Sequence, residues 1–262
     1  MQKYGLIISV VLLSVSCFGG PNYPELWFPV GETLTYKIVW GILPIAEAKL
    51  SSRWVEEEDE EGKRILVSLL ATIRTYAIFD AVYPMDDRVE CLVDPETFTP
   101  VRSVVCLSEK QKQLSETTIF DYKHGIAHWR PAKPALPKDL AITPDTRDFL
   151  SVIFLLRRQK FEPGQTCHYR IMATHKFYDL EITAEKHEKT GLPRHGQISC
   201  MALQAQTAFK GFLIQVDRMQ GWISEDKRSL CAKFIARTSA FGRIRITLEK
   251  VEGPGDDFWL KR

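Results

Sequence analysis

The chain has 262 residues, 45% of them hydrophobic and 26% charged, with a formal net charge of +2 at neutral pH. This length is enough for one large or two small domains with a hydrophobic core. Basic and acidic residues are mixed along the chain, which argues against the clustered Lys and Arg of a nucleic-acid-binding surface.

The N-terminal segment has the layout of a secretory signal. A single charged residue, Lys3, precedes an uncharged apolar run that ends in small residues at Ser16. The run is shorter than the roughly 20 apolar residues that span a bilayer. The sequence LSVSC, which ends at Cys17, resembles the bacterial lipobox, in which the signal is cut before a cysteine that becomes lipidated. We therefore expect a signal peptide over residues 1–16 and a lipid on Cys17.

Two alternatives to lipidation are ordinary cleavage near Gly19 or Gly20 and an uncut anchor. Residues 17–27 follow as a tether, uncharged and rich in Gly and Pro up to Pro24. Phe18 stands where enterobacterial sorting rules favour the outer membrane in the absence of Asp. The expected location is the bacterial cell envelope, facing the periplasm and anchored in the outer membrane.

The cysteine count leaves the disulfide pattern open. If Cys17 is lipidated, an odd number of cysteines remains, so at least one is free or pairs between chains. Cys91 and Cys200 alternate with apolar residues and are expected in the core. No C-x-x-C spacing occurs, which gives a zinc or thioredoxin site no support. The cysteines whose pairing stays open are Cys91, Cys106, Cys167, Cys200 and Cys231.

The first half of the chain alternates with a period of two, which is typical of strands. Residues Thr33–Trp40 and Ala46–Trp54 flank a turn and predict a hairpin that is apolar on one side. The acidic run Glu56–Lys63 then predicts a solvated loop rather than a cation site. Further strands are expected at Arg64–Tyr76, on both sides of the turn Asp94–Thr97, at Gln113–Tyr122 and at Ile126–Trp129.

Residues 130–163 differ in composition and predict a Pro-rich extended linker followed by a helix. Phe149, Val152, Ile153 and Leu156 recur at helical spacing. Thr143 or Asp145 is expected to cap this helix, with Pro144 in its first turn. Pro163-Gly164 should end it.

The second half repeats the order of the first. GETLTYKI at Gly31–Ile38 returns as GQTCHYRI at Gly164–Ile171, an offset of 164 − 31 = 133 residues. A hairpin is predicted from Thr166–Ala173 and Phe177–Lys186, and later strands at Gln197–Phe209, on both sides of the turn Ser224–Arg228, and at Arg243–Val251. These parallels predict an internal duplication. The expected domain covers residues 28–251, with pseudo-repeats 28–129 and 164–251 and a tail over 252–262.

The predicted fold is mostly antiparallel β, a meander of about ten to twelve strands in one curved sheet or open barrel that the central helix partly covers. Two packed β-sandwich halves are the alternative.

Three stretches together resemble a bacterial exported family called domain of unknown function 3108. They are FPVGETLTYKIVWGILPIAEAKL, DTRDFLSVIFLLRR, and GWISEDKRSL followed by FGRIRITL. The resemblance spans roughly residues 28 to 251. The sequence departs from the family pattern at Pro44-Ile45-Ala46 and at Ser229-Leu230. The family has no assigned chemistry, so the resemblance implies an envelope β-protein and names no activity.

No catalytic or metal-binding constellation stands out. His124 and His128 are four apart but flank Gly125, so they lack the one-face geometry of a helical zinc motif. The sequence contains no G-x-S-x-G elbow, P-loop or G-x-G-x-x-G. Asp86-Asp87 and Asp256-Asp257 have no evident partner for acid–base work. We expect neither enzymatic activity, nor a metal, nor a cofactor.

Aromatic and aliphatic side chains of the hairpins suggest two functions. A curved sheet lined by them could hold a lipid or other hydrophobic ligand, whereas the simpler interpretation places them in the core under the helix. The candidate lining residues are Tyr36, Ile38, Trp40, Trp54, Tyr169 and Trp222. The first functional hypothesis is a membrane-tethered protein that binds a hydrophobic ligand. The alternative is an interaction or scaffold protein of the outer membrane or periplasm.

Overall fold

The computed structural model describes residues 23–254 except 60–61, 111, 211–214 and 239–241. The predicted signal peptide, Cys17 and residues 255–262 of the predicted tail lie outside the described residues. The described chain forms, in order, β1 (Thr33–Trp40), β2 (Leu43–Asp59), β3 (Gly62–Thr75), α1 (Ala77–Asp80), β4 (Asp86–Val93), β5 (Pro100–Glu109), β6 (Lys112–Asp121), β7 (Ile126–Pro131), β8 (Lys138–Ala141), β9 (Thr146–Arg147), α2 (Phe149–Leu156), β10 (Thr166–Ala173), β11 (Lys176–Leu192), β12 (Gly196–Lys210), β13 (Gln215–Ser224), β14 (Cys231–Thr238) and β15 (Gly242–Glu252).

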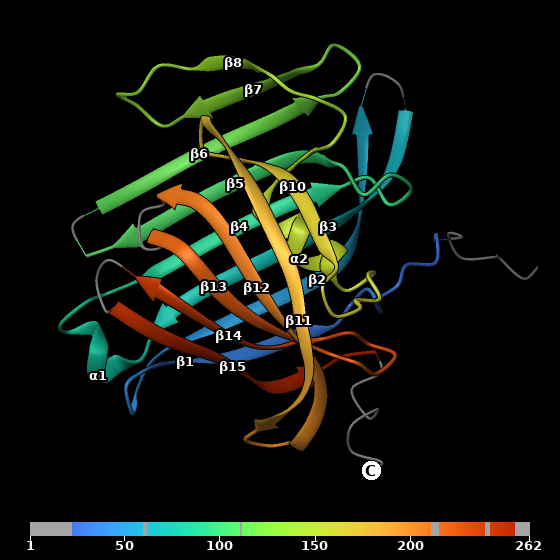
Figure 1. Cartoon of the computed structure of the whole chain (residues 1–262). Coiled ribbons are helices and arrows are strands. Elements are labelled where there is room, and N and C mark those ends of the chain that lie inside the picture. Colours follow the sequence, from blue (N-terminus) through green and yellow to red (C-terminus); the bar gives the residue numbers. More distant parts are fainter. Residues whose placement is uncertain (1–22, 60–61, 111, 211–214, 239–241, 255–262) are drawn as a thin grey trace, which may run out of the picture.

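All these strands belong to one sheet, in the order β8-β7-β6-β5-β4-β3-β2-β1-β15-β14-β13-β12-β11-β10-β9. Neighbours are antiparallel except β9 and β10, which are parallel. β1 pairs with β2 on one side and with β15 on the other, so the two halves of the chain join in the middle of the sheet. The predicted curved, open sheet is confirmed (Figure 1). The alternative of two packed sandwiches is wrong.

The fifteen strands exceed the predicted ten to twelve, because the Pro-rich segment also pairs. Lys138–Ala141 forms β8 against Ile126–Trp129 of β7. Thr146–Arg147 forms the two-residue β9 beside β10. The segment predicted as an extended linker thus also contributes two short strands, since an extended backbone next to an open sheet edge finds hydrogen-bond partners.

The acidic run is strand rather than solvated loop. β2 continues to Asp59 and β3 begins at Gly62. Glu57 faces Arg64 and Glu58 faces Lys63 across the two strands. Because opposite charges face each other in the antiparallel pair, the carboxylates favour extension of the hairpin.

Helix α2 is shorter than predicted, and a different residue caps it. Neither Thr143 nor Asp145 is the N-cap; Asp148 is, and its carboxylate accepts hydrogen bonds from the backbone N–H of Leu150 and Ser151, each at 3.0 Å. The chain cannot begin the helix earlier because Thr146–Arg147 is committed to β9. The predicted caps were therefore wrong for a tertiary reason.

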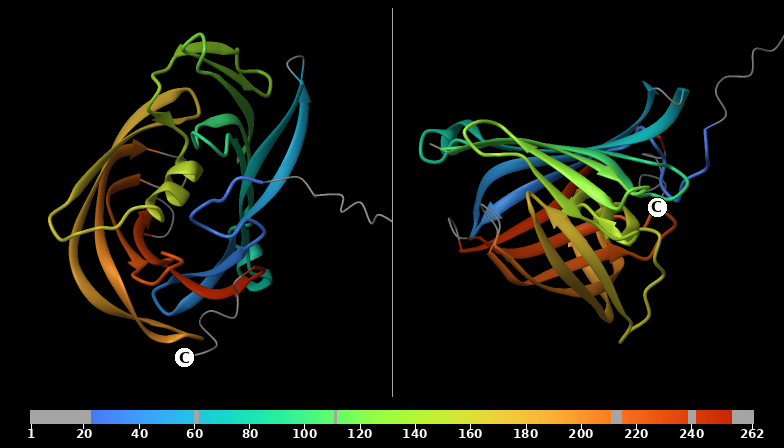
Figure 2. Two further views of the ribbon diagram at one scale, coloured as in Figure 1. Left: turned by 90° about the vertical axis from the view of Figure 1, so that its right-hand side faces the viewer. Right: turned by 90° about the horizontal axis from the view of Figure 1, so that it is seen from above.

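Helix α2 lies on the concave side of the sheet, as Figure 2 shows. Its sequence, FLSVIFLL, is apolar nearly all round, the pattern of a helix buried on most sides. Leu150 and Phe154 pack into a core cluster with strands of both halves. Val152 and Leu156 pack into a second cluster under β10 to β14. The helix that was predicted to cover part of the sheet is thus buried on its concave side.

The two edges of the sheet approach each other without backbone pairing. Phe120, Ala127 and Trp129 from β6 and β7 form a cluster with Ile142 and with Met172 of β10. The ring centroids of Trp129 and His175 are 4.7 Å apart. Apolar side chains therefore bring the edges together where the hydrogen-bond ladder is absent.

The first hairpin of each half has the same dimensions. β1 and β10 have 8 residues each, and β2 and β11 have 17 each. Trp40 faces Leu43 at one turn, and Ala173 faces Lys176 at the other, both at the offset of 133 residues that the echoed octet shows. A bulge after Ile38 distinguishes the first hairpin. Descent of the two halves from one ancestral unit stays a prediction.

Candidate functional site

Three charged side chains meet inside the curved sheet. Glu32, Arg157 and Arg228 are 0%, 3% and 7% exposed. Each comes from a different one of the three stretches that carry the family resemblance: GETLTYKI, the α2 segment, and the β13–β14 turn. We call these residues the buried triad.

Both guanidinium groups bind the same carboxylate. Arg157 donates to both oxygens of Glu32, with Nη2 3.3 Å from Oε2. Arg228 Nη2 lies 2.5 Å from Oε2. Arg157 also donates from Nε and Nη2 to the backbone carbonyl of Arg228, at 3.4 and 3.3 Å. Two cations and one anion thus share a space that is nearly closed to solvent.

Local structure positions each member of the triad. Gly31, at φ +105°, allows the turn that leads into β1, and its N–H donates to the Ser52 carbonyl at 3.0 Å. Arg157 is the C-cap residue of α2, where a positive charge suits the negative end of the helix dipole. The backbone N–H of Arg228 donates to Asp226 Oδ1 at 2.8 Å in the β13–β14 turn.

Aromatic rings surround the charges. The guanidinium carbon of Arg157 lies 5.3 Å from the ring centroid of Phe28 and 5.5 Å from that of Phe154, within cation–π range. Trp27 Nε1 donates to the Phe154 carbonyl at 2.8 Å. The N-terminal segment therefore covers the C-terminal end of α2.

Two neutral groups beside the triad have shifted pKa values. Burial raises the pKa of Tyr36 well above its usual value. The nearby Cys231 and Glu32 raise this pKa further, whereas Arg157 acts in the opposite direction. Burial raises the pKa of Cys231 to about 12. The Tyr36 hydroxyl is buried without a hydrogen-bond partner among the described residues. Both groups stay protonated at neutral pH.

This arrangement joins segments rather than activating a reactant. A carboxylate that two guanidinium groups hold is a poor base, because its lone pairs are engaged. The triad connects the N-terminal segment, the end of α2 and the β13–β14 turn. None of the three residues stood out in the sequence as a candidate for a site. Only Glu32 is a single charge among uncharged neighbours, whereas Arg157 precedes Arg158 and Arg228 ends a run of four charged residues, so no local pattern marks the three as buried.

The predicted ligand-lining residues do not gather in one place. Tyr36 and Trp222 are buried in the cluster around α2, and the Trp222 indole donates to Glu188. Ile38 lies in a separate cluster near β15. Trp54 packs against the edge of the same cluster as Tyr36 and Trp222, and it stacks on Tyr23 with ring centroids 4.7 Å apart. Two further members of the set are Trp40, which is 42% exposed, and Tyr169, which packs at the edge of the cluster under β10 to β14.

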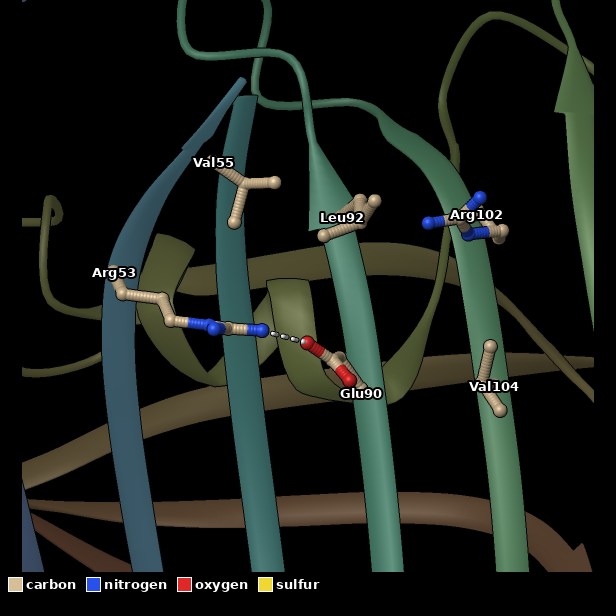
Figure 3. Close-up of a pocket in the computed structure, with 6 residues that line it drawn as sticks. All are labelled: Arg53, Val55, Glu90, Leu92, Arg102 and Val104. Carbon is tan, nitrogen blue, oxygen red and sulfur yellow. Dashed lines mark hydrogen bonds and ion pairs between the residues drawn. The ribbon is translucent and has the colours of Figure 1, made fainter. Parts of the chain in front are cut away.

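A hollow of about 170 Å³ lies on the outer face of the sheet (Figure 3). Its lining residues are Arg53, Val55, Glu90, Leu92, Arg102 and Val104. Arg53 pairs with Glu90 at 3.2 Å, and Arg102 pairs with Glu57 at 2.5 Å. Partial burial raises the pKa of Glu90, but hydrogen bonds from Ser68, Arg88 and Arg53 outweigh it and lower that pKa below its usual value. Each lining guanidinium thus already has a carboxylate partner.

The other residues considered for chemistry also lie apart. Asp86 pairs with Arg74 at 2.5 Å, whereas the buried Asp87 accepts from the Ser108 N–H at 2.9 Å. His128 contacts Asp139 at 2.9 Å. Among residues 23–254, apart from the undescribed gaps, no cluster of three or more His, Cys, Asp or Glu is arranged to hold a metal ion. Asp256-Asp257 lies outside the described residues.

Within the described part of the chain, no helix has the length and apolar character needed to cross a membrane.

The profile of the family described as "Protein of unknown function (DUF3108)" matches residues 35–249. No curated protein matches the chain.

Three solved structures match the chain over most of its length. A beta-barrel-like protein of domain of unknown function DUF1849 from Brucella abortus has a TM-score of 0.52 at 9% identity, covering 85% of this chain and 97% of its own. A candidate exported protein with a YmcC-like fold from Bacteroides fragilis has a TM-score of 0.37 at 8% identity, with 86% and 97% coverage. A candidate lipoprotein from Parabacteroides distasonis has a TM-score of 0.32 at 9% identity, with 86% and 98% coverage. The first shows a shared barrel-like architecture.

Proposed function

We propose, from the premise that this chain belongs to the DUF3108 family of proteins of unknown function, that it is a non-enzymatic lipoprotein of the bacterial envelope with an interaction or scaffold role. Its signal-like N-terminus and lipobox support export and a lipid on Cys17. A periplasm-facing location at the outer membrane is part of this proposal.

The observation that carries the scaffold role is the filled interior. Helix α2 occupies the concave side of the sheet, and the N-terminal segment packs on its end. Tyr36 and Trp222, which would line a hydrophobic ligand, already contact this core. A carrier of lipid needs a concave apolar space, and these side chains are used in packing instead. The surfaces of the curved sheet are therefore better candidates for function.

A lipid-retention measurement separates this proposal from the hydrophobic-ligand hypothesis. The mature chain, residues 17–262 with Cys17→Ser, is purified without detergent and analysed by native mass spectrometry and by solvent extraction. We expect the mass of the bare polypeptide. Detection of one lipid per chain would instead support the hydrophobic-ligand hypothesis, particularly if Trp222→Leu released that lipid.

The anchor is tested on the full-length chain in a bacterial host fed labelled palmitate. Label should enter the wild-type protein and be lost in Cys17→Ser. Label that persists in the variant would contradict lipidation at Cys17, and ordinary cleavage near Gly19 or Gly20 would then be identified by N-terminal sequencing.

A further inference from the structure

One end of the curved sheet exposes a group of large apolar side chains, which we call the apolar tip. It consists of Trp40, Ile42, Leu43, Ile78 and Val82, which are 42%, 91%, 49%, 83% and 68% exposed. The first three belong to the β1–β2 turn, and the last two belong to the connection from β3 through α1 to β4. Single exposed apolar residues are ordinary, whereas a contiguous group indicates a contact surface.

The two connections form one surface because β2 and β3 are paired strands. Ala46 faces Thr75 at the end of that pair, and the Tyr76 N–H donates to the Ile45 carbonyl at 3.0 Å. The rings of Trp40 and Phe79 pack edge to face with centroids 6.4 Å apart. Figure 1 shows α1 and the β1–β2 turn at the same end of the molecule.

Few charges accompany these side chains. The segment WGILPIA, residues 40–46, has none, and AIFDAVYP, residues 77–84, has only Asp80. The Asp80 carboxylate accepts a hydrogen bond from Thr75 Oγ1 at 2.9 Å. Toward the sheet, Glu47 follows on β2, and Arg74 pairs with Asp86 at 2.5 Å.

Charged residues also border the tip on neighbouring elements. Lys110 Nζ lies 6.0 Å from the centroid of the Tyr83 ring, and Arg245 of β15 faces Val39, which precedes Trp40. The exposed apex of the tip is formed by apolar side chains.

We propose that the apolar tip inserts into the interfacial layer of a lipid bilayer. A standard protein–protein interface uses about 20–30 residues on each side. The tip offers five exposed apolar side chains on two turns, which is too little for such an interface. Small protruding apolar groups can enter the acyl boundary without a shaped partner, and Trp favours the headgroup level. The two segments themselves carry no basic residue, so apolar side chains make the first contact with the bilayer.

This inference does not rest on the scaffold role or on acylation of Cys17. The test uses residues 17–262 with Cys17→Ser, so that neither a signal peptide nor an attached lipid binds the membrane. Flotation with vesicles of phosphatidylethanolamine and phosphatidylglycerol (3:1), and with phosphatidylcholine vesicles, measures the partition coefficient. This chain, called wild type below because its tip is unchanged, should bind vesicles of both compositions. Ile42→Asp/Ile78→Asp should reduce binding at least about tenfold, because it puts two carboxylates where hydrocarbon is expected.

A matched control carries the same added charge elsewhere. Leu136→Asp/Ile119→Asp changes side chains that are 78% and 47% exposed, in the β7–β8 connection and on β6. This variant should bind like wild type. Equal binding by both double variants, or no binding by wild type, would overturn the proposal. Circular dichroism melting confirms that each variant is folded before vesicles are added.

Two further readouts identify the occupant. Brominated phosphatidylcholine should quench wild-type tryptophan fluorescence, and Trp40→Phe should lose part of that quenching. Size-exclusion chromatography with light scattering tests self-association. A wild-type dimer that Ile42→Asp/Ile78→Asp converts to monomer, without vesicle binding, would assign the tip to a second copy and refute the bilayer contact.

Discussion

Glu32 is the residue on which the charge balance of the interior depends. Its carboxylate binds Arg157 and Arg228 with no exposure to water. Transfer of ions from water into the interior is costly, so such a cluster contributes to stability only while all partners are present. Removal of the anion alone leaves two buried cations facing each other.

We expect Glu32→Leu to lower the free energy of unfolding by about 3–5 kcal/mol, since it leaves the two guanidinium charges uncompensated. Urea titration followed by circular dichroism measures this change. The triple variant Glu32→Leu/Arg157→Met/Arg228→Leu should recover most of the loss, because no buried charge remains.

A half-exposed ion pair provides the control. Arg102 and Glu57 form a pair at 2.5 Å, with side chains 43% and 25% exposed. Glu57→Gln should change the free energy of unfolding by no more than about 1 kcal/mol. If Glu32→Leu lowered the free energy of unfolding no more than Glu57→Gln does, the triad would not hold the three segments together as its geometry indicates.

At the scale of the element, the start of α2 depends on one side chain. Asp148 accepts from two backbone N–H groups, and the thiol of Cys91 lies 3.2 Å from its Oδ1. These contacts also tie the helix to β4. Burial, then the charge and hydrogen bond of Asp148, raise the pKa of Cys91 well above its usual value. The thiol therefore remains a donor to the cap at neutral pH.

Asp148→Ala should destabilise the protein by about 0.5–2 kcal/mol, because the first helical N–H groups lose their acceptor. Asp145→Ala, at the exposed position that the sequence favoured as a cap, should change stability by no more than about 0.5 kcal/mol. Chemical denaturation of both variants measures the difference. The reverse order of the two effects would contradict the observed cap and favour the sequence-based one.

At the scale of the whole molecule, the sheet encloses its thiols unequally. Cys91, Cys200 and Cys231 are buried, whereas Cys106 and Cys167 are partly accessible, and all five are free thiols. Burial raises the pKa of both Cys200 and Cys231 to about 12. Only the thiolate reacts quickly with disulfide reagents, so accessibility and pKa act in the same direction.

We expect Ellman's reagent at pH 8 to modify Cys106 and Cys167 in the folded protein carrying Cys17→Ser. The three buried cysteines should react only after unfolding, because their thiolates require the sheet to open. Rapid modification of all five in the absence of denaturant would contradict the enclosed core. Mass spectrometry of the modified chain identifies which thiols reacted.

The same thiols predict how stability depends on pH. Because the folded pKa values of Cys200 and Cys231 lie above the unfolded value near 8.5, their contribution is complete below that pH. It decreases as pH rises toward about 12, where the folded thiols ionise too. The urea concentration at the midpoint of unfolding should therefore decrease above pH 9. The decrease should be less steep in Cys231→Ala.

The fold keeps the two proposed membrane contacts, the apolar tip and the lipid on Cys17, apart. The apolar tip lies at the end of β1, and the described chain begins near the opposite end of that strand (Figure 1). The eight residues of β1 span about 26 Å. The six residues 17–22 reach at most about 21 Å. The tether is thus shorter than β1 by about 5 Å, so if both contacts form on one bilayer, β1 must tilt away from the membrane normal.

Local pattern was enough to predict much of the fold. Alternation with a period of two placed the hairpins Thr33–Trp40 with Ala46–Trp54 and Thr166–Ala173 with Phe177–Lys186, and the apolar spacing around Phe149 predicted a helix. These signals concern neighbours along the chain, so they survive without knowledge of the tertiary structure. The resemblance to the family rests on the same kind of evidence, and the family profile confirms it.

The sequence by itself therefore determined a mostly antiparallel β-protein with a central helix and its family, together with the expectation of export. Only the tertiary structure decided the buried triad, the cap at Asp148, the pairing of the Pro-rich segment as β8, and the union of β1 with β15. Glu32 and Arg228 are 196 residues apart. Contacts over such separations depend on how the sheet curves and closes around α2, and no periodicity along the chain encodes them.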